Sequence, residues 1–317
     1  MLSIVFFGTD EFATYILSKL LSSKKKVVAV VTKPDRATKR GGELLPTPVK
    51  RFLEQNYPKI PLFQPEKAST SSFAQTLRSF SPDLFVVVSY GEIINDELLA
   101  IPKLLPINIH PSALPKYRGA SPLRSAILSG ENKIGIAIIE MVKAMDAGDI
   151  LKMSTMEIFS DENHTDIEKR MFIEASNLLF ACLDDFEKNR VSKTPQVGEV
   201  TFTKKFKKED AWINWSKSID DIINFIRAFG DSPGALAKIS LHGKESIIKI
   251  TKVTKHLLEK SLEPQTLAFS KKDGWLIGCK NGVVKISMLQ PENKKLMNVQ
   301  DFINGSQGHT PALILES

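Results

Sequence analysis

The amino-terminal half of this 317-residue chain alternates short, almost wholly apolar segments with longer segments of helical periodicity. Between the first two apolar segments, Asp10 can cap a helix that runs to about residue 21 with its apolar side chains on one stripe. Apolar strands that alternate with amphipathic helices indicate a mostly parallel sheet with helices on both faces. We therefore predict an α/β, Rossmann-like domain over residues 1–188, with strands at 2–7, 27–31, 84–88 and 107–109.

The carboxy-terminal part has a different pattern. From about residue 235, short apolar runs are separated by glycine turns such as Lys280-Asn281-Gly282, which is typical of antiparallel hairpins. We predict a smaller β-barrel domain over residues 208–317. Residues 189–207, punctuated by Pro195 and Gly198, are predicted to link the two domains.

The net charge of +7 is concentrated in the second domain. Residues 201–317 contain 18 Lys and Arg against 12 Asp and Glu, and four lysines surround Phe206. A basic surplus in one domain indicates a polyanionic partner, although a lysine-rich solvated surface gives the same pattern.

Several classes of protein are disfavoured. No apolar run approaches the roughly 20 residues that span a bilayer, and no basic segment precedes an apolar one at the amino terminus. We expect a cytoplasmic protein without a membrane span, in which Cys182 and Cys279 are two buried thiols. The cysteines and five histidines lack the spacing of a metal site, so none is expected. The turn after the first strand lacks the glycine pattern of a dinucleotide site.

Polar side chains that could perform chemistry follow the predicted strands. Asn108 and His110 alternate, so both point to the same side of an extended chain. An amide and a titratable ring together can stabilise and protonate a carbonyl oxygen that becomes an oxyanion. Asp146, two residues before Gly148, could orient the ring or move a proton. A lone Asn-x-His is more often a loop pair with satisfied hydrogen bonds, so the motif alone does not decide.

Longer stretches carry a resemblance. The stretch NIHPSALPKYRGASPL from Asn108 and the stretch GIAIIEMVKAMDAGDI from Gly135 resemble the formyltransferase family that uses 10-formyltetrahydrofolate. FFGTDEFA from Phe6, TKPDRATKRGGELLPTPVK from Thr32 and IRAFGDSPGAL from Ile226 support it, and the similarity extends over nearly the whole chain. It implies that the second domain is OB-like and that the chain acts as a monomer.

The resemblance also implies the roles of the site residues. Asn108 would donate to the oxyanion, His110 would act as a second donor and general acid, and Asp146 would orient His110 and accept the proton of the attacking amine. The matching folate-binding positions are Ser112, Ala113, Leu114, Pro115, Val88, Tyr90 and Gly91. Ala113 replaces a leucine of the family, and Tyr90 could equally be part of the core.

Within the family, the chain is most similar to members that formylate initiator methionyl-tRNA and release tetrahydrofolate. In these members a basic loop, here residues 33–50, contacts the acceptor arm. The candidate tRNA-binding residues are Arg36, Lys39, Arg40, Lys50, Lys204, Lys205, Lys207 and Lys208. Two alternatives remain open at this point: a formyltransferase for an amino-sugar nucleotide or glycinamide ribonucleotide, and a tRNA-binding module without activity.

Overall fold

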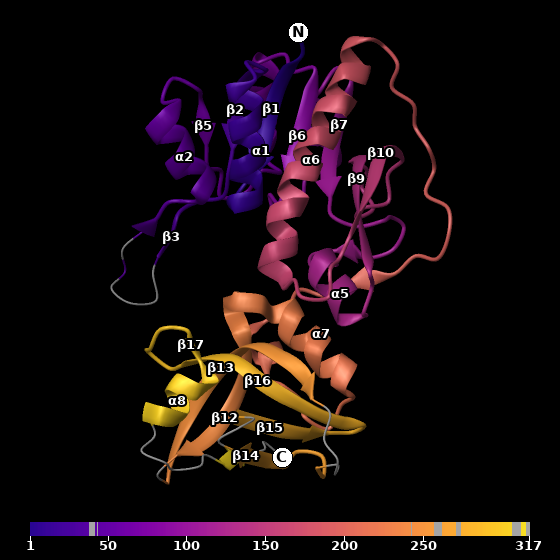
Figure 1. The fold of residues 1–317 in the computed structure, drawn as a ribbon. Helices are drawn as coiled ribbons and strands as arrows, with labels where there is room; N and C mark the ends of the chain where they lie inside the picture. The colour runs from indigo at the N-terminus through magenta and orange to yellow at the C-terminus, as the bar shows by residue number, and fades with distance from the viewer. Residues whose placement is uncertain are drawn as a thin grey trace. The chain divides into compact units, whose positions relative to one another are not determined.

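The computed structural model describes residues 1–37, 42, 44–241, 243–256, 262–270, 274–305 and 312–314. The chain divides into two compact units (Figure 1). Unit 1 comprises Met1–Gly119, Ile134–Met156 and Lys169–Phe202, and unit 2 comprises Ala120–Lys133, Glu157–Glu168 and Thr203–Ser317. The predicted division into 1–188, 189–207 and 208–317 differs in detail, because contacts assign most of the predicted linker to unit 1.

Unit 1 is built on a sheet with the strand order β10-β9-β7-β6-β1-β2-β5. The pairs β1–β2, β1–β6, β6–β7 and β2–β5 are parallel, whereas β9 runs antiparallel to β7. The predicted Rossmann-like α/β class is therefore confirmed, with an antiparallel addition beyond β7. The strands are β1 (Ser3–Gly8), β2 (Lys26–Val31), β5 (Leu62–Phe63), β6 (Leu84–Val88), β7 (Leu105–His110), β9 (Lys133–Glu140) and β10 (Ile150–Glu157).

Helices cover both faces of this sheet because its central strands are buried on both sides. On one face, Val5 and Phe7 of β1 share a buried cluster with α3 (Ser71–Ser79) and α4 (Asp96–Leu99). On the other, Phe12 of α1 (Glu11–Ser22) stacks on Phe172 of α6 (His164–Glu187) at 4.8 Å between ring centroids. Figure 1 shows α1 and α6 side by side on this face of the sheet. The remaining helices before α6 are α2 (Pro48–Asn56) and α5 (Pro122–Leu128).

The helix starts follow local capping chemistry. Asp10 caps α1 as predicted, since its Oδ1 accepts a hydrogen bond from the Ala13 amide at 3.0 Å. Thr165 and Glu168 have the spacing of a capping box in the sequence, but α6 does not begin with it. Instead the Asn163 Oδ1 accepts from the amides of Thr165 and Asp166, and Asp166 accepts in return from the Asn163 amide.

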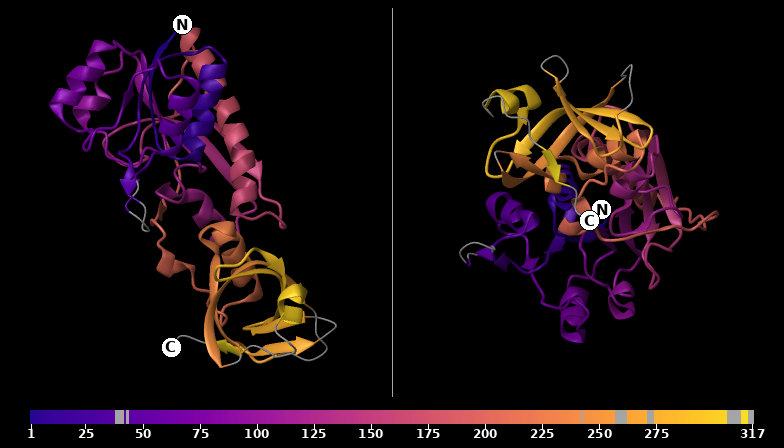
Figure 2. Two further views of the ribbon diagram at one scale, coloured as in Figure 1. Left: turned by 90° about the vertical axis from the view of Figure 1, so that its left-hand side faces the viewer. Right: turned by 90° about the horizontal axis from the view of Figure 1, so that it is seen from below.

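Unit 2 contains a curved antiparallel sheet with the order β14-β15-β16-β13-β12-β18 (Figure 2). This half-barrel agrees with the predicted small β-domain, and α7 (Ile219–Phe229) buries its apolar face in the same unit. The other elements are β12 (Ala235–Leu241), β13 (Lys244–His256), β14 (Leu267–Ser270), β15 (Gly274–Cys279), β16 (Gly282–Pro291), β17 (Met297–Asn298), α8 (Val299–Gly305) and β18 (Ala312–Ile314).

Both cysteines are free and buried, as predicted. Burial raises the pKa of the Cys182 thiol to about 12 and that of the Cys279 thiol to about 11. None of the helices in the described ranges combines the length and the apolar character needed to cross a bilayer.

Candidate active site

The strand β7 brings Asn108 and His110 to the middle of the sheet of unit 1. Asn108 lies opposite Val87 of the parallel strand β6, and His110 lies opposite Ala137 of the antiparallel strand β9. Asn108 is half-buried and His110 is buried. Within the described residues the side-chain amide of Asn108 has no hydrogen-bond partner, so its N–H groups are available to a ligand.

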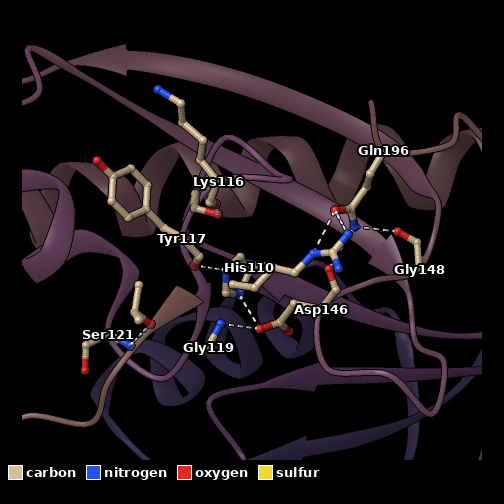
Figure 3. Close-up of polar contacts among 11 residues, drawn as sticks. His110, Lys116, Tyr117, Gly119, Ser121, Asp146, Gly148 and Gln196 are labelled. Atoms are coloured by element: carbon tan, nitrogen blue, oxygen red, sulfur yellow. Dashed lines mark hydrogen bonds and ion pairs between the residues drawn. The ribbon is translucent and has the colours of Figure 1, made fainter. Parts of the chain in front are cut away.

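The ring of His110 lies between two oxygen atoms of the chain (Figure 3). Its Nε2 is 3.0 Å from the carbonyl oxygen of Tyr117, and its Nδ1 is 3.6 Å from Oδ2 of Asp146. Because a carbonyl oxygen only accepts, the contact with Tyr117 favours a proton on Nε2. The nitrogen that faces Asp146 is then the one that gains a proton when the ring becomes charged.

Burial lowers the pKa of His110 below its usual value of 6.5. The negative charge of Asp146 and the hydrogen bond to Tyr117 oppose this effect, whereas the charge of Arg118 adds to it. The ring is therefore neutral at neutral pH in the free protein. A protonated His110 has to arise during a reaction, where the adjacent carboxylate would stabilise it.

The carboxylate of Asp146 is bonded to a backbone amide, and the loop that carries Asp146 packs closely on β9. Its Oδ2 accepts a hydrogen bond of 2.8 Å from the Gly119 amide. Two residues later, a side chain on Gly148 would place Cβ only 1.9 Å from the Glu140 carbonyl oxygen, so the loop can pack on β9 only with glycine there. The predicted trio of Asn108, His110 and Asp146 therefore lies in one region of unit 1, and its catalytic role stays a prediction.

Two further sets of polar contacts in this region were not identified from the sequence. Gln196 donates to the carbonyl oxygens of Asp146 and Gly148, both at 2.8 Å, and its Oε1 accepts from Arg118 at 2.7 Å (Figure 3). The amide of Tyr117 donates to Oγ1 of Thr201 at 2.8 Å. Isolated polar residues in a connecting segment carry no periodic signal, so the pattern of the chain offered no way to select them.

The predicted folate stretch after β7 forms a compact, packed turn. The hydroxyl of Ser112 donates to the Lys116 carbonyl at 2.7 Å, so it closes this turn. Leu114 packs in a small cluster with Ala137 and Ile139, and Pro115 is also buried. Ala113 lies against the backbone of β9, because a Cβ on Gly135 would meet it at about 2.4 Å.

The second predicted folate stretch follows β6, beside β7. Val88 is buried, and Gly91 is exposed with φ +75°. Tyr90 belongs to the core, where its ring lies 5.4 Å from that of Phe7 in an edge-on contact. Burial raises the pKa of Tyr90, and its hydroxyl finds no hydrogen-bond partner in the described part of the chain.

The candidate tRNA-binding residues of unit 1 differ in their availability. Arg36 is exposed on β3 (Arg36–Ala37), which pairs with β4 (Leu44–Leu45). The ammonium of Lys50 is 2.6 Å from the Asp35 carboxylate, so part of its charge is already compensated. Lys39 and Arg40 lie outside the described residues.

In unit 2, the four candidate lysines around Phe206 are all exposed. Lys204 forms an ion pair with Asp210, whereas Lys208 lines a hollow of about 580 Å³. Trp212 also lines this hollow and is half-buried, while Trp215 is buried. Within the described ranges, no three His, Cys, Asp or Glu side chains come together as a metal site.

Comparison with known proteins identifies the family. The model of the family described as Formyl transferase matches residues 2–183, and that of the Formyl transferase C-terminal domain matches residues 205–307. The chain belongs to the formyl transferase family. This formyltransferase is 36% identical to the methionyl-tRNA formyltransferase of Protochlamydia amoebophila, with 96% of this chain and 95% of the relative covered. It is 35% identical to that of Thermodesulfovibrio yellowstonii, with 95% of each chain covered.

A solved structure agrees with the fold. The sugar 3N-formyltransferase WlaRD, crystallised in the presence of dTDP and 5-N-formyl-THF, aligns with a TM-score of 0.65. The alignment covers 93% of this formyltransferase and 99% of WlaRD, at 19% identity. At this identity the match supports the shared fold only and carries no argument about which molecule accepts the formyl group.

Proposed function

We propose that this formyltransferase moves the formyl group of 10-formyltetrahydrofolate to the free amino group of initiator methionyl-tRNA. The observation that carries the proposal is the meeting of Asn108, His110 and Asp146 in a chain whose full-length relatives are methionyl-tRNA formyltransferases. An amide donor, a neutral imidazole and a carboxylate are the groups that acyl transfer to an amine requires.

The reaction needs one bond to form and one to break. The amine nitrogen attacks the formyl carbon, and the formyl oxygen becomes an oxyanion that accepts from the Asn108 amide. The amine then loses a proton to Asp146 or, through it, to Nδ1 of His110, 3.6 Å away. Cleavage of the bond to the folate nitrogen follows, and the same proton returns to that nitrogen to give tetrahydrofolate.

The structure supports different roles for Asn108 and His110, the two predicted donors to the oxyanion. Among the residues that the structure describes, none bonds to the Asn108 side-chain amide, which supports its role toward the oxyanion. Both ring nitrogens of His110 already face oxygen atoms, which supports proton transfer through Asp146. A direct bond from His110 to the oxyanion would require the ring to leave Tyr117 or Asp146.

Folate binding is assigned to the two segments that flank Asn108 at the ends of β6 and β7. Ligands of open α/β sheets bind at the carboxyl ends of parallel strands, and Val88 and His110 occupy such ends. We assign Ser112 to Pro115 to shaping this site rather than to polar contacts, because the Ser112 hydroxyl is engaged with Lys116.

For tRNA, we assign the exposed cations Arg36, Lys205, Lys207 and Lys208 to phosphate contacts, together with Lys39, Arg40, Lys50 and Lys204. The exposure of the first four supports this assignment. Shape and backbone contacts dominate recognition of paired RNA, which suits a lysine-rich surface. We also expect the protein to act as a monomer in the cytoplasm, which light scattering and cell fractionation would test.

One assay tests the function. The protein is incubated with 10-formyltetrahydrofolate and either charged initiator methionyl-tRNA or a uridine-diphosphate amino sugar. We expect formyl-methionine on the tRNA and no modified sugar, and the reverse pattern would overturn the proposal. Asn108→Ala should lower kcat by about 100- to 1000-fold while tRNA affinity stays near that of the unchanged protein, because only an oxyanion donor is lost.

A further inference from the structure

The segment 194–201, which follows α6 and the turn after it, contacts both residues whose oxygen atoms flank His110. It has little regular structure, and its backbone joins unit 1 through reciprocal bonds of 2.8 and 2.9 Å between Ile150 and Thr194. From Ser192 to Val200 every residue is exposed except Gln196. A single covered polar residue in an exposed segment indicates that its side chain has a specific task.

Both polar atoms of the Gln196 side chain form hydrogen bonds. Its Nε2 donates to the carbonyl oxygens of Asp146 and Gly148, both at 2.8 Å. Its Oε1 accepts from Nη2 and Nε of Arg118, at 2.7 and 3.2 Å. The residue after Arg118, Gly119, donates its amide to the Asp146 carboxylate. Asp146 is thus held from its backbone by Gln196 and from its side chain by the neighbour of Arg118.

Thr201 acts on the other side of the His110 ring. Its Oγ1 accepts from the Tyr117 amide at 2.8 Å, and its carbonyl oxygen accepts from the Arg118 amide at 2.9 Å. The Tyr117 carbonyl is the group that contacts Nε2 of His110. Gln196 and Thr201 therefore support one His110 partner each.

We propose that Gln196 and Thr201 are positioning residues of the formyl-transfer site, which keep Asp146 and the Tyr117 carbonyl on opposite nitrogens of the His110 ring. The proposal rests on the proposed function for its kinetic readout. Asp146 has φ +50° and Tyr117 has φ +60°, conformations that non-glycine residues adopt only when their surroundings hold them. Gln196, 50 positions from Asp146, and Thr201, 84 positions from Tyr117, provide the hydrogen bonds that stabilise these two conformations.

The first test compares variants of the full-length protein. Gln196→Met keeps the length of the side chain and removes its hydrogen bonds, and Gln196→Glu keeps an acceptor for Arg118 but offers no N–H to the two carbonyls. We expect both to lower kcat by about 10- to 100-fold, because displacement of a reacting group by about 1 Å costs that much. The KM for methionyl-tRNA should change less than twofold.

The matched control is Lys193→Met. It breaks the 2.6 Å ion pair between Lys193, which directly precedes the segment, and Glu140 of β9, without touching the partners of His110. It should keep the kcat of the unchanged protein. Equal losses in Lys193→Met and Gln196→Met would mean that the segment matters only as an attachment, and unchanged kcat in both Gln196 variants would overturn the proposal for Gln196.

A second measurement does not depend on the acceptor. Thr201→Val preserves shape and removes the bond to the Tyr117 amide. Long-range proton–nitrogen spectra at neutral pH report which nitrogen of His110 carries the proton, and we expect Nε2 in the unchanged protein. In Thr201→Val the proton should shift partly to Nδ1, and an unchanged tautomer in the folded variant would overturn the role of Thr201. If the unchanged protein forms no formyl-methionyl-tRNA, the proposed function fails while this spectrum still decides the inference.

Discussion

At the scale of single residues, the site depends on two backbone conformations that residues other than glycine rarely adopt. Tyr117 and Asp146 both have positive φ, and each directs one oxygen toward the ring of His110. Such conformations cost on the order of 1 kcal/mol each and persist where neighbours impose them. Here the neighbours are hydrogen-bond partners distant in the chain. The positions of the two oxygen atoms beside His110 therefore depend on Gln196 and Thr201, which take no part in the proposed reaction.

The charge of Asp146 can be tested separately from its hydrogen bonding. Asp146→Asn keeps an oxygen for the Gly119 amide but can neither accept a proton nor stabilise a charged His110. We expect kcat to fall at least about 100-fold with little change in tRNA affinity, as measured by steady-state kinetics and filter binding. Asp149→Asn, three residues away, is the control and should retain activity. A variant at Asp146 with near-normal kcat would exclude it from proton transfer.

At the scale of elements, local patterns predicted four strands of the unit 1 sheet and the helix α1. The apolar run at residues 84–88 is β6, and the stripe after Asp10 is α1. These signals are local, because side-chain periodicity follows directly from strand and helix geometry. β7 is longer than the predicted 107–109, since Leu105 and Pro106 are recruited by pairing with β6.

The start of α6 shows how two plausible caps compete. Asn163 and Thr165 both carry oxygen atoms that can cap, and the structure uses Asn163 with Asp166. We expect Asn163→Ala to lower the free energy of unfolding by about 1 kcal/mol, and Thr165→Ala to have a smaller effect. Chemical denaturation measures both. A larger loss in Thr165→Ala would favour a cap at Thr165 instead.

At the scale of the whole molecule, charge and pH set the conditions of activity. The net charge is +7, and the surplus of lysine and arginine is in residues 201–317. Neutralisation of phosphates by such groups makes nucleic-acid affinity depend steeply on salt. Lys204, which is paired with Asp210, should contribute less to that dependence than Lys205, Lys207 and Lys208.

Lys204 and Lys205 are adjacent lysines with different surroundings. Lys204 is paired with Asp210, while Lys205 is exposed. We expect Lys205→Ala to reduce the slope of log Kd against log salt concentration for tRNA by about 1, and Lys204→Ala to reduce it less. Titrations at several salt concentrations measure the slope. Equal slopes in both variants would contradict the distinction.

Acid should destabilise the fold through the half-buried His164. Burial, with a smaller effect of Arg124, lowers the pKa of His164 from 6.5 to about 4. The unfolded chain then binds more protons between pH 6.5 and 4, so stability is fully present above pH 6.5 and falls as the pH drops to 4. The loss is up to about 3 kcal/mol. His164→Gln should flatten this dependence in urea denaturation. An unchanged slope in His164→Gln would contradict the assignment.

The α/β class of the first domain, the family and the trio of Asn108, His110 and Asp146 could be read from the printed residues, because periodicity and motifs are properties of neighbouring positions. The hydrogen bonds that keep Asp146 and Tyr117 in place around His110 could not be predicted in this way. Gln196 and Thr201 reach Asp146 and Tyr117 across 50 and 84 positions, and neither stands in a periodic pattern. Hydrogen bonds of this kind exist only after the chain has packed, since packing alone brings such distant atoms within 3 Å of each other.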